Sequence, residues 1–178
     1  MYQPRSSARP RDSFSSTRLM LVAMFGLLLA AVGCRPSDRY LAEEAVNRGS
    51  AHAKKGDYDR AIVEFTEAIR LKPDLAEAFY DRGNAYGRKG DLDRAIADYT
   101  KAIPLKPNYA LAYCNRGVAY AKKGEQDLAI ADFTEAIRLK PDFAMAYRNR
   151  GLALTEKGEK SKAEVDFSKA KELGLGSK

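Results

Sequence analysis

The chain has 178 residues, of which 45% are hydrophobic and 31% are charged, and its formal net charge is +7 at pH 7. This length and balance favour a folded domain or a short repeat array over a disordered chain. The two signs are interspersed, with 27 Lys and Arg against 23 Asp and Glu from Cys34 onward. A nucleic-acid partner is therefore not expected, because it would require basic residues clustered on one face.

The residue types that carry most catalytic and metal chemistry are scarce. The chain contains one histidine, His52, and two cysteines, Cys34 and Cys114, without the spacing of metal ligands. No phosphate-binding loop, dinucleotide-binding motif or nucleophile elbow is present. We therefore expect no enzyme activity, no cofactor and no metal, and we interpret His52 and Cys114 as packing residues.

The segment 1–33 has the organisation of an export signal, with a polar part at 1–18 and an apolar part at 19–32. The polar part carries four arginines against one aspartate, and the apolar part, LMLVAMFGLLLAAV, carries no charge at all. A basic stretch followed by about 7–15 apolar residues predicts a secretory signal. A transmembrane helix would need about 20 apolar residues to cross the bilayer, and this run is shorter.

The end of this signal, AVGC at residues 31–34, resembles the lipobox of bacterial lipoproteins. The resemblance implies cleavage before Cys34, a lipid on its thiol and attachment to a membrane of the bacterial cell envelope. Arg35 stands where an aspartate would retain the protein at the inner membrane, so the resemblance favours the outer membrane. An uncleaved N-terminal anchor and a soluble exported protein remain alternatives. In the lipoprotein interpretation, residues 34–41 form a short tether.

The remainder of the chain repeats one pattern at a constant interval, which divides it into segments 42–75, 76–109, 110–143 and 144–177. Glycine, alanine and proline mark the period most clearly. They occur at Gly49, Gly83, Gly117 and Gly151, at Ala61, Ala95, Ala129 and Ala163, and at Pro73, Pro107 and Pro141. In the third segment, apolar residues recur at helical spacing from Ala129 to Ile137, which indicates one buried helix face.

This period and pattern resemble the tetratricopeptide repeat, a pair of antiparallel helices. The resemblance implies an all-α fold, a right-handed superhelical solenoid of four helix-turn-helix repeats whose first helices line a concave wall. The glycines inside the first helices each cost roughly 1 kcal/mol relative to alanine. We therefore expect the second helix to approach closely at each glycine, with Ala61 and its equivalents as the facing residues.

The helix ends carry further signals. Gly56, which follows a helical run ending in lysine, and its three equivalents are expected to stop the first helices in a left-handed conformation. Asp74, after Pro73, is suited to cap the first helix of the second repeat. Pro104 replaces an arginine of the neighbouring repeats and is expected to end or kink its helix near Ile103, because proline removes a backbone hydrogen bond.

A column of arginines stands where the tetratricopeptide family usually has leucine, in step with a column of acids on the second helices. We interpret the two columns as ion pairs across the seam between the helices rather than as a phosphate site. The predicted pairs are Arg48 with Glu64, Arg82 with Asp98, Arg116 with Asp132, and Arg150 with Asp166.

The family resemblance also places one face of each first helix on the concave wall. The lysines of the family's clamp for C-terminal carboxylates are absent, because Val46, Tyr80 and Cys114 stand in one of its columns. We expect instead an extended or helical peptide, with apolar anchors toward the last two repeats. The predicted groove residues are Asn47, Tyr80, Asn84, Asn115, Val118, Arg148, Asn149 and Leu152.

These features indicate a membrane-anchored scaffold that binds another protein or a peptide in the cell envelope. The alternative is a homo-oligomer that stacks through its C-terminal end, because no further helix follows the last repeat. Four lysines are expected to give that end a solvated surface. They are Lys160, Lys162, Lys169 and Lys171.

Overall fold

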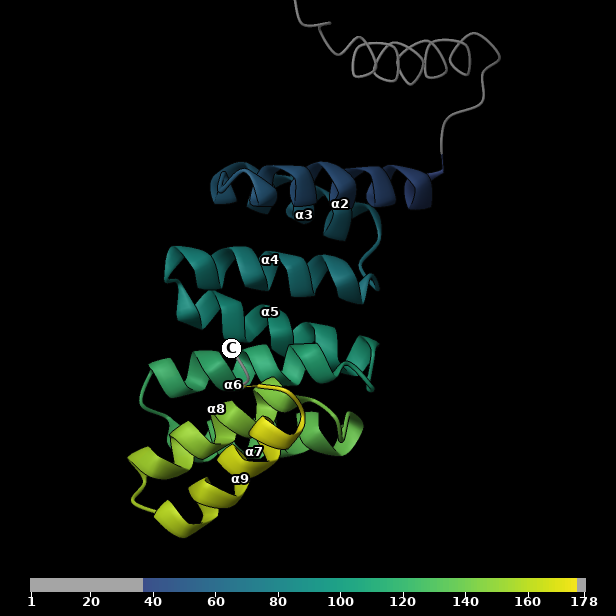
Figure 1. Cartoon of the computed structure of the whole chain (residues 1–178). Coiled ribbons are helices and arrows are strands. Elements are labelled where there is room, and N and C mark those ends of the chain that lie inside the picture. Colours follow the sequence, from purple (N-terminus) through teal and green to yellow (C-terminus); the bar gives the residue numbers. More distant parts are fainter. Residues whose placement is uncertain (1–36, 176–178) are drawn as a thin grey trace, which may run out of the picture. The chain divides into compact units, whose positions relative to one another are not determined.

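The computed structural model describes residues 37–175, which form eight α-helices and no strand (Figure 1). The helices are α2 (Asp38–Lys54), α3 (Tyr58–Leu71), α4 (Ala76–Lys89), α5 (Leu92–Leu105), α6 (Ala110–Lys122), α7 (Gln126–Leu139), α8 (Ala144–Glu156) and α9 (Lys160–Glu172). The predicted export signal and Cys34 lie outside the described residues. Within the described range, no helix is long and apolar enough to cross a membrane.

The helices form four consecutive pairs, α2–α3, α4–α5, α6–α7 and α8–α9. Each second helix also contacts the first helix of the next pair, and successive first helices touch one another. Figure 1 shows the pairs following each other in chain order from α2 to α9. The predicted all-α solenoid of four helix pairs is therefore confirmed.

The first helix begins earlier than the sequence pattern indicates. It starts at Asp38, so residues 38–41, which the lipoprotein interpretation places in the tether, are helical. Asp38 favours this start, because a carboxylate in the first turn interacts well with the helix dipole. Three residues therefore separate Cys34 from α2.

The two helices of each pair approach closely at a buried glycine of the first helix. A Cβ atom built on Gly117 would lie 2.8 Å from Cε1 of Phe133. The expected close approach is confirmed, but the facing group is an aromatic ring, not the Ala61 column. The alanines of that column are buried, and at Gly83 the Ala95 carbonyl oxygen lies 3.3 Å from the built Cβ, behind the Tyr99 ring at 2.8 Å. The other glycine–ring contacts are Gly49 with Phe65, Gly83 with Tyr99, and Gly151 with Phe167.

Among the second helices, α3 and α5 have a side-chain cap and α7 and α9 have none. Asp57 and Asp91 cap α3 and α5, each accepting a backbone hydrogen bond at 3.2 Å through its carboxylate. The capping role predicted for Asp74 is wrong, because α4 begins only at Ala76 and has no side-chain cap. The Asp74 carboxylate instead pairs with Lys72 at 2.7 Å. The left-handed glycines are confirmed, with φ from 79° to 86° at Gly56, Gly90, Gly124 and Gly158.

Pro104 neither ends nor shortens its helix. α5 continues to Leu105 and has the same 14 residues as α3 and α7, so the predicted end near Ile103 is wrong. Pro104 stands one residue before the helix end, and its missing N–H removes a single hydrogen bond from the last turn. Lys106 closes that turn by donating its backbone N–H to the carbonyls of Ala102 and Ile103.

Both end faces of the array carry charges where the interior repeats are apolar. Glu44 on α2 occupies the repeat position of three alanines that are fully buried in the later repeats, at Ala78, Ala112 and Ala146. On α9, Glu164 and Lys171 take the positions of Ile130 and Ile137, which pack against a core containing α8 residues. Lys171 is exposed, as expected for a solvated end.

Candidate functional site

The predicted arginine–acid pairs form the seam within each helix pair. The Arg116 guanidinium donates two hydrogen bonds of 2.8 Å to Asp132, which is 6% exposed, and a third of 3.0 Å to Thr100 of the preceding repeat. The hydrogen bond to the aspartate raises the pKa of Arg116. Arg82–Asp98 and Arg150–Asp166 repeat this geometry. Each of these guanidiniums is bound to an acidic side chain across the seam, so the structural interpretation of the column is confirmed.

The seam pair of the first repeat is weaker. Arg48 reaches Glu64 at 2.8 Å, but their side chains are 47% and 24% exposed, against 17% and 8% for Arg116 and Asp132. Arg48 also lies 3.9 Å from Glu44 on its own helix. The pair at this end of the array is therefore largely solvated, whereas the interior pairs are enclosed.

Three pockets open in succession between neighbouring first helices, and we name each by the repeats that frame it. The 1–2 pocket lies among α2, α3 and α4 and has a volume of about 420 Å³. The 2–3 pocket lies among α4, α5 and α6, with about 430 Å³, and the 3–4 pocket among α6, α7 and α8, with about 400 Å³. The pockets share lining residues, so together they form one groove along the first helices.

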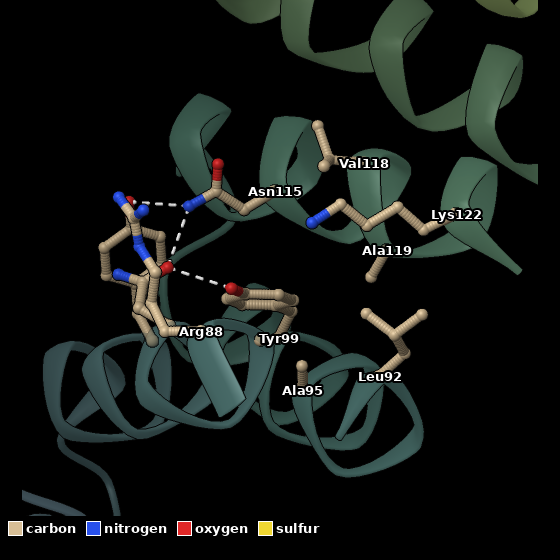
Figure 2. A pocket seen from close by; sticks show the side chains of 11 residues that line it. Arg88, Leu92, Ala95, Tyr99, Asn115, Val118, Ala119 and Lys122 are labelled. Carbon is tan, nitrogen blue, oxygen red and sulfur yellow. Dashed lines mark hydrogen bonds between the residues drawn. The ribbon is translucent and has the colours of Figure 1, made fainter. Parts of the chain in front are cut away.

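A polar network fixes one wall of the 2–3 pocket (Figure 2). Tyr99 donates its hydroxyl to Asn84 Oδ1 at 2.9 Å, and Asn115 donates to the same oxygen at 2.8 Å and to the Tyr80 hydroxyl at 3.1 Å. Burial raises the pKa of both tyrosines, which stay protonated in the physiological range. The network joins α4, α5 and α6 and holds the two amides in one orientation.

The structure brings six of the eight predicted groove residues to these pockets. Tyr80, Asn84, Asn115 and Val118 line the 2–3 pocket, and Asn149 and Leu152 line the 3–4 pocket together with Val118. Asn47 and Arg148 are exposed on α2 and α8 and line none of the three pockets.

The two residues that we interpret as packing groups, Cys114 and His52, are buried and half-buried. Cys114 is 2% exposed and forms no disulfide, and its sulfur lies 4.0 Å from Asn149 Nδ2. Burial raises the pKa of its thiol to about 11, so the reactive thiolate is not populated near neutral pH. His52 is half-buried, with Nδ1 4.0 Å from the Asp57 carboxylate. Among residues 37–175, no group of three or more potential ligands could hold a metal ion.

An acidic side chain also lines the groove. Asp81 lines the 1–2 pocket, and burial, with a smaller contribution from Glu77, raises the pKa of its carboxyl to about 6. Glu77, one turn earlier, behaves in the opposite way, because its 2.8 Å contact with Lys106 lowers its pKa. Asp81 occupies the repeat position of three asparagines in the other repeats.

Sequence reasoning missed a basic column at the ends of the first helices. Lys54, Arg88 and Lys122 stand at equivalent positions of successive repeats, and each of them lines at least one of the three pockets. Glu156 takes the fourth position of the column. The repeat interval that predicts the arginine–acid pairs of the seam also places these basic residues at equivalent positions, so the column could have been found in the sequence.

A row of helix pairs whose first helices frame a continuous groove is the architecture of a helical-repeat scaffold. Models of the family match most of the repeat region: "TPR repeat" at residues 49–90 and 83–124, and "Tetratricopeptide repeat" at residues 110–143. The chain belongs to the tetratricopeptide repeat family. No curated protein sequence matches the chain significantly.

Solved structures of the same architecture cover most of the chain. A crystal structure of MamA is 29% identical, covers 93% of this chain and 96% of its own, and superposes with a TM-score of 0.74. The tetratricopeptide domain of Arabidopsis OM64 is 26% identical over 66% of this chain and 98% of its own, with a TM-score of 0.65. The second such domain of Spaghetti (RPAP3), bound to the HSP90 peptide SRMEEVD, is 34% identical over 57% of this chain and 95% of its own, with a TM-score of 0.55.

Proposed function

We propose that this protein is a scaffold that binds a peptide segment of another protein along the groove formed by the three pockets. The observation that carries the proposal is the contrast between seam and groove. The seam keeps the same arginine–acid chemistry in every repeat, whereas one groove column reads Ser50, Asn84, Val118 and Leu152 and so differs in each repeat. A surface that only stabilised the array would have no reason to vary in this way.

Peptide binding by related domains supports this proposal. The second tetratricopeptide domain of RPAP3 has been solved with an HSP90 peptide and, for the human protein, with the HSP70 peptide SGPTIEEVD. The clamp lysines expected for C-terminal carboxylates are absent from this chain, because Tyr80 and Cys114 stand in one of their columns. We therefore propose an internal segment of the partner as the ligand.

Apolar side chains near the last two repeats would anchor such a segment. Leu152 is 45% exposed at the 3–4 pocket, and Val118 is half-buried between the 2–3 and 3–4 pockets. Partial exposure beside a concave pocket is typical of residues that bury their apolar surface on binding. Their repeat equivalents, Ser50 and Asn84, are polar, so the groove changes character along its length.

The proposed scaffold is anchored in the bacterial cell envelope through a lipid on Cys34, with the outer membrane favoured. The AVGC motif supports this, and the start of α2 at Asp38 would hold the groove close to the membrane surface. Intact-mass measurement of protein extracted from membranes tests it. We expect a chain that begins at Cys34 and carries added acyl mass, and an unmodified or uncleaved chain would contradict lipidation.

Self-association through the ends of the array has less support. The charges at Glu44, Glu164 and Lys171 occupy the positions through which the interior repeats pack. Burying them between two copies would cost more than the apolar contact returns. The exposure of Val165 is not specific to the end, because its equivalent Val63 is also 68% exposed. We therefore favour a heterologous partner.

An array of random dodecapeptides tests peptide binding by the full chain in a non-ionic detergent. We expect bound peptides whose signal is lost in the double variant Val118→Asp/Leu152→Asp and kept in Val63→Asp. Val63 is the matched control, because it is an exposed aliphatic residue on a second helix that lines none of the three pockets. Equal binding by both variants, with unchanged helicity, would reject the groove.

A further inference from the structure

Three basic side chains of the groove have no charge partner in the described part of the chain. Lys54, Arg88 and Lys122 are exposed and make no hydrogen bond or ion pair with any described residue. The residues that follow Arg88 and Lys122 behave differently: Lys89 and Lys123 pair with Asp59 and Asp93 of the preceding repeat. At these two helix ends, the cation that lines the groove is unpaired and the next residue is paired.

The three cations follow the groove from pocket to pocket. Lys54 and Arg88 both line the 1–2 pocket, Arg88 and Lys122 both line the 2–3 pocket, and Lys122 continues into the 3–4 pocket. The column ends there, because Glu156 takes its fourth position and lines the 3–4 pocket. The groove is therefore basic at its first three repeats and loses this character at the fourth.

The 2–3 pocket has the clearest preference for an anion. Its lining residues include Arg88 and Lys122 and no aspartate or glutamate. Figure 2 shows these two basic side chains coming from neighbouring first helices, with the hydrogen-bonded amide of Asn115 on the same helix as Lys122. The 1–2 pocket also holds two cations but contains Asp81, so it attracts an anion less strongly.

We propose that the groove recognises an acidic segment of its partner, with Asp or Glu side chains paired to Arg88 and Lys122 in the 2–3 pocket. Lys54 extends the acidic subsite toward the first repeat, and Leu152 receives an apolar side chain at the other end. This inference rests on the proposed peptide-binding function and adds the chemistry of the ligand. Unpaired cations along a concave surface attract and orient an oppositely charged ligand.

An acidic peptide fits the groove better than a nucleic acid. Tight binding of a nucleic-acid strand depends on neutralising many phosphates in succession. This column supplies three cations, and Asp81 and Glu156 lie in pockets at either end of it. The limited length of the basic stretch matches a short run of carboxylates.

The peptide array used above, read for amino-acid composition, tests the inference. We expect the bound sequences to be enriched in Asp and Glu. For a selected acidic peptide, fluorescence polarisation should give a Kd at least about tenfold higher for Arg88→Ala/Lys122→Ala than for the wild type, since each lost pair is a charge-assisted contact. The matched control is Lys101→Ala/Lys160→Ala, which removes two exposed cations that line none of the three pockets and should leave the Kd unchanged.

The outcomes separate the inference from the proposed function. Bound peptides that are neutral or basic, but still lost in Val118→Asp/Leu152→Asp, would overturn the acidic ligand and leave groove binding intact. A Kd that rises equally in the control variant would also overturn the acidic ligand, because the loss of net positive charge of the protein would then explain the effect. Displacement of the acidic peptide by a single-stranded oligonucleotide at similar concentration would favour nucleic acid instead. An array without any bound peptide would contradict both proposals.

Discussion

The seam and the groove of this solenoid follow opposite rules, although both are built from the same repeat unit. At the seams of the second, third and fourth repeats, Arg82, Arg116 and Arg150 make the same three contacts. In the groove, one column reads Ser50, Asn84, Val118 and Leu152, so no two repeats agree. The comparison teaches that residues which hold the helices of the array together are repeated. Residues that are not needed for this packing can differ between repeats and bind a partner.

The largest expected effect comes from breaking an interior seam. Asp132→Ala leaves the Arg116 guanidinium half-buried without its partner, and we expect a loss of about 3 kcal/mol in unfolding free energy. Glu64→Ala is the control at the solvated end and should cost less than about 1 kcal/mol. Urea denaturation followed by circular dichroism measures both. Equal costs would show that enclosure of the interior pairs does not matter.

The contact between glycine and ring gives the next largest effect. Gly117→Ala places a methyl group 2.8 Å from the buried Phe133 ring, and we expect a net loss of about 1 kcal/mol after the gain in helix propensity. Gly87→Ala is the matched control, since its new Cβ would have ordinary contacts of 3.8 Å. It should stabilise the protein by about 0.5–1 kcal/mol through helix propensity alone. Thermal unfolding of both variants tests whether the two substitutions change the unfolding free energy in opposite directions.

Asp81 offers a smaller, pH-dependent effect on the groove side. Its pKa of about 6 lies above the usual value of 3.8, so the folded state favours the protonated form. This stabilisation is present at low pH and is lost as the pH rises through 6. Asp81→Asn should therefore leave the unfolding temperature unchanged near pH 4 and raise it at pH 7.5. The gain in unfolding free energy at pH 7.5 should be about 0.5–1 kcal/mol, because the group is half-buried. A shift that is the same at both pH values would contradict the burial of this carboxyl.

The sequence alone could predict the features that recur in every repeat. The four helix pairs, the seam partners and the left-handed glycines all repeat, and all are present in the structure. The uninterrupted α5 could not be predicted, because the last turn of a helix can lose one hydrogen bond to a proline without ending there. The rings facing the glycines could not be separated from the nearby alanines, since both columns have the same period.

The candidate site was predictable only in part. Asn84, Asn115 and Val118 lie together at one pocket because matching positions of neighbouring repeats meet there. The basic column was visible in the sequence, but only the structure distinguishes Arg88 and Lys122 from the neighbouring lysines that have ion-pair partners. Whether a surface charge is paired depends on three-dimensional contacts that a single sequence does not specify.

The most direct test of the account is the site at which a bound peptide touches the protein. A peptide selected on the array, with a benzophenone side chain at its centre, is irradiated with the full chain in detergent, and the crosslinks are located by mass spectrometry. We predict crosslinks on α4, α6 and α8, at residues lining the 2–3 and 3–4 pockets, such as Val118 and Leu152. Crosslinks concentrated on exposed residues of the second helices, such as Val63 or Val165, would contradict the groove as the binding surface.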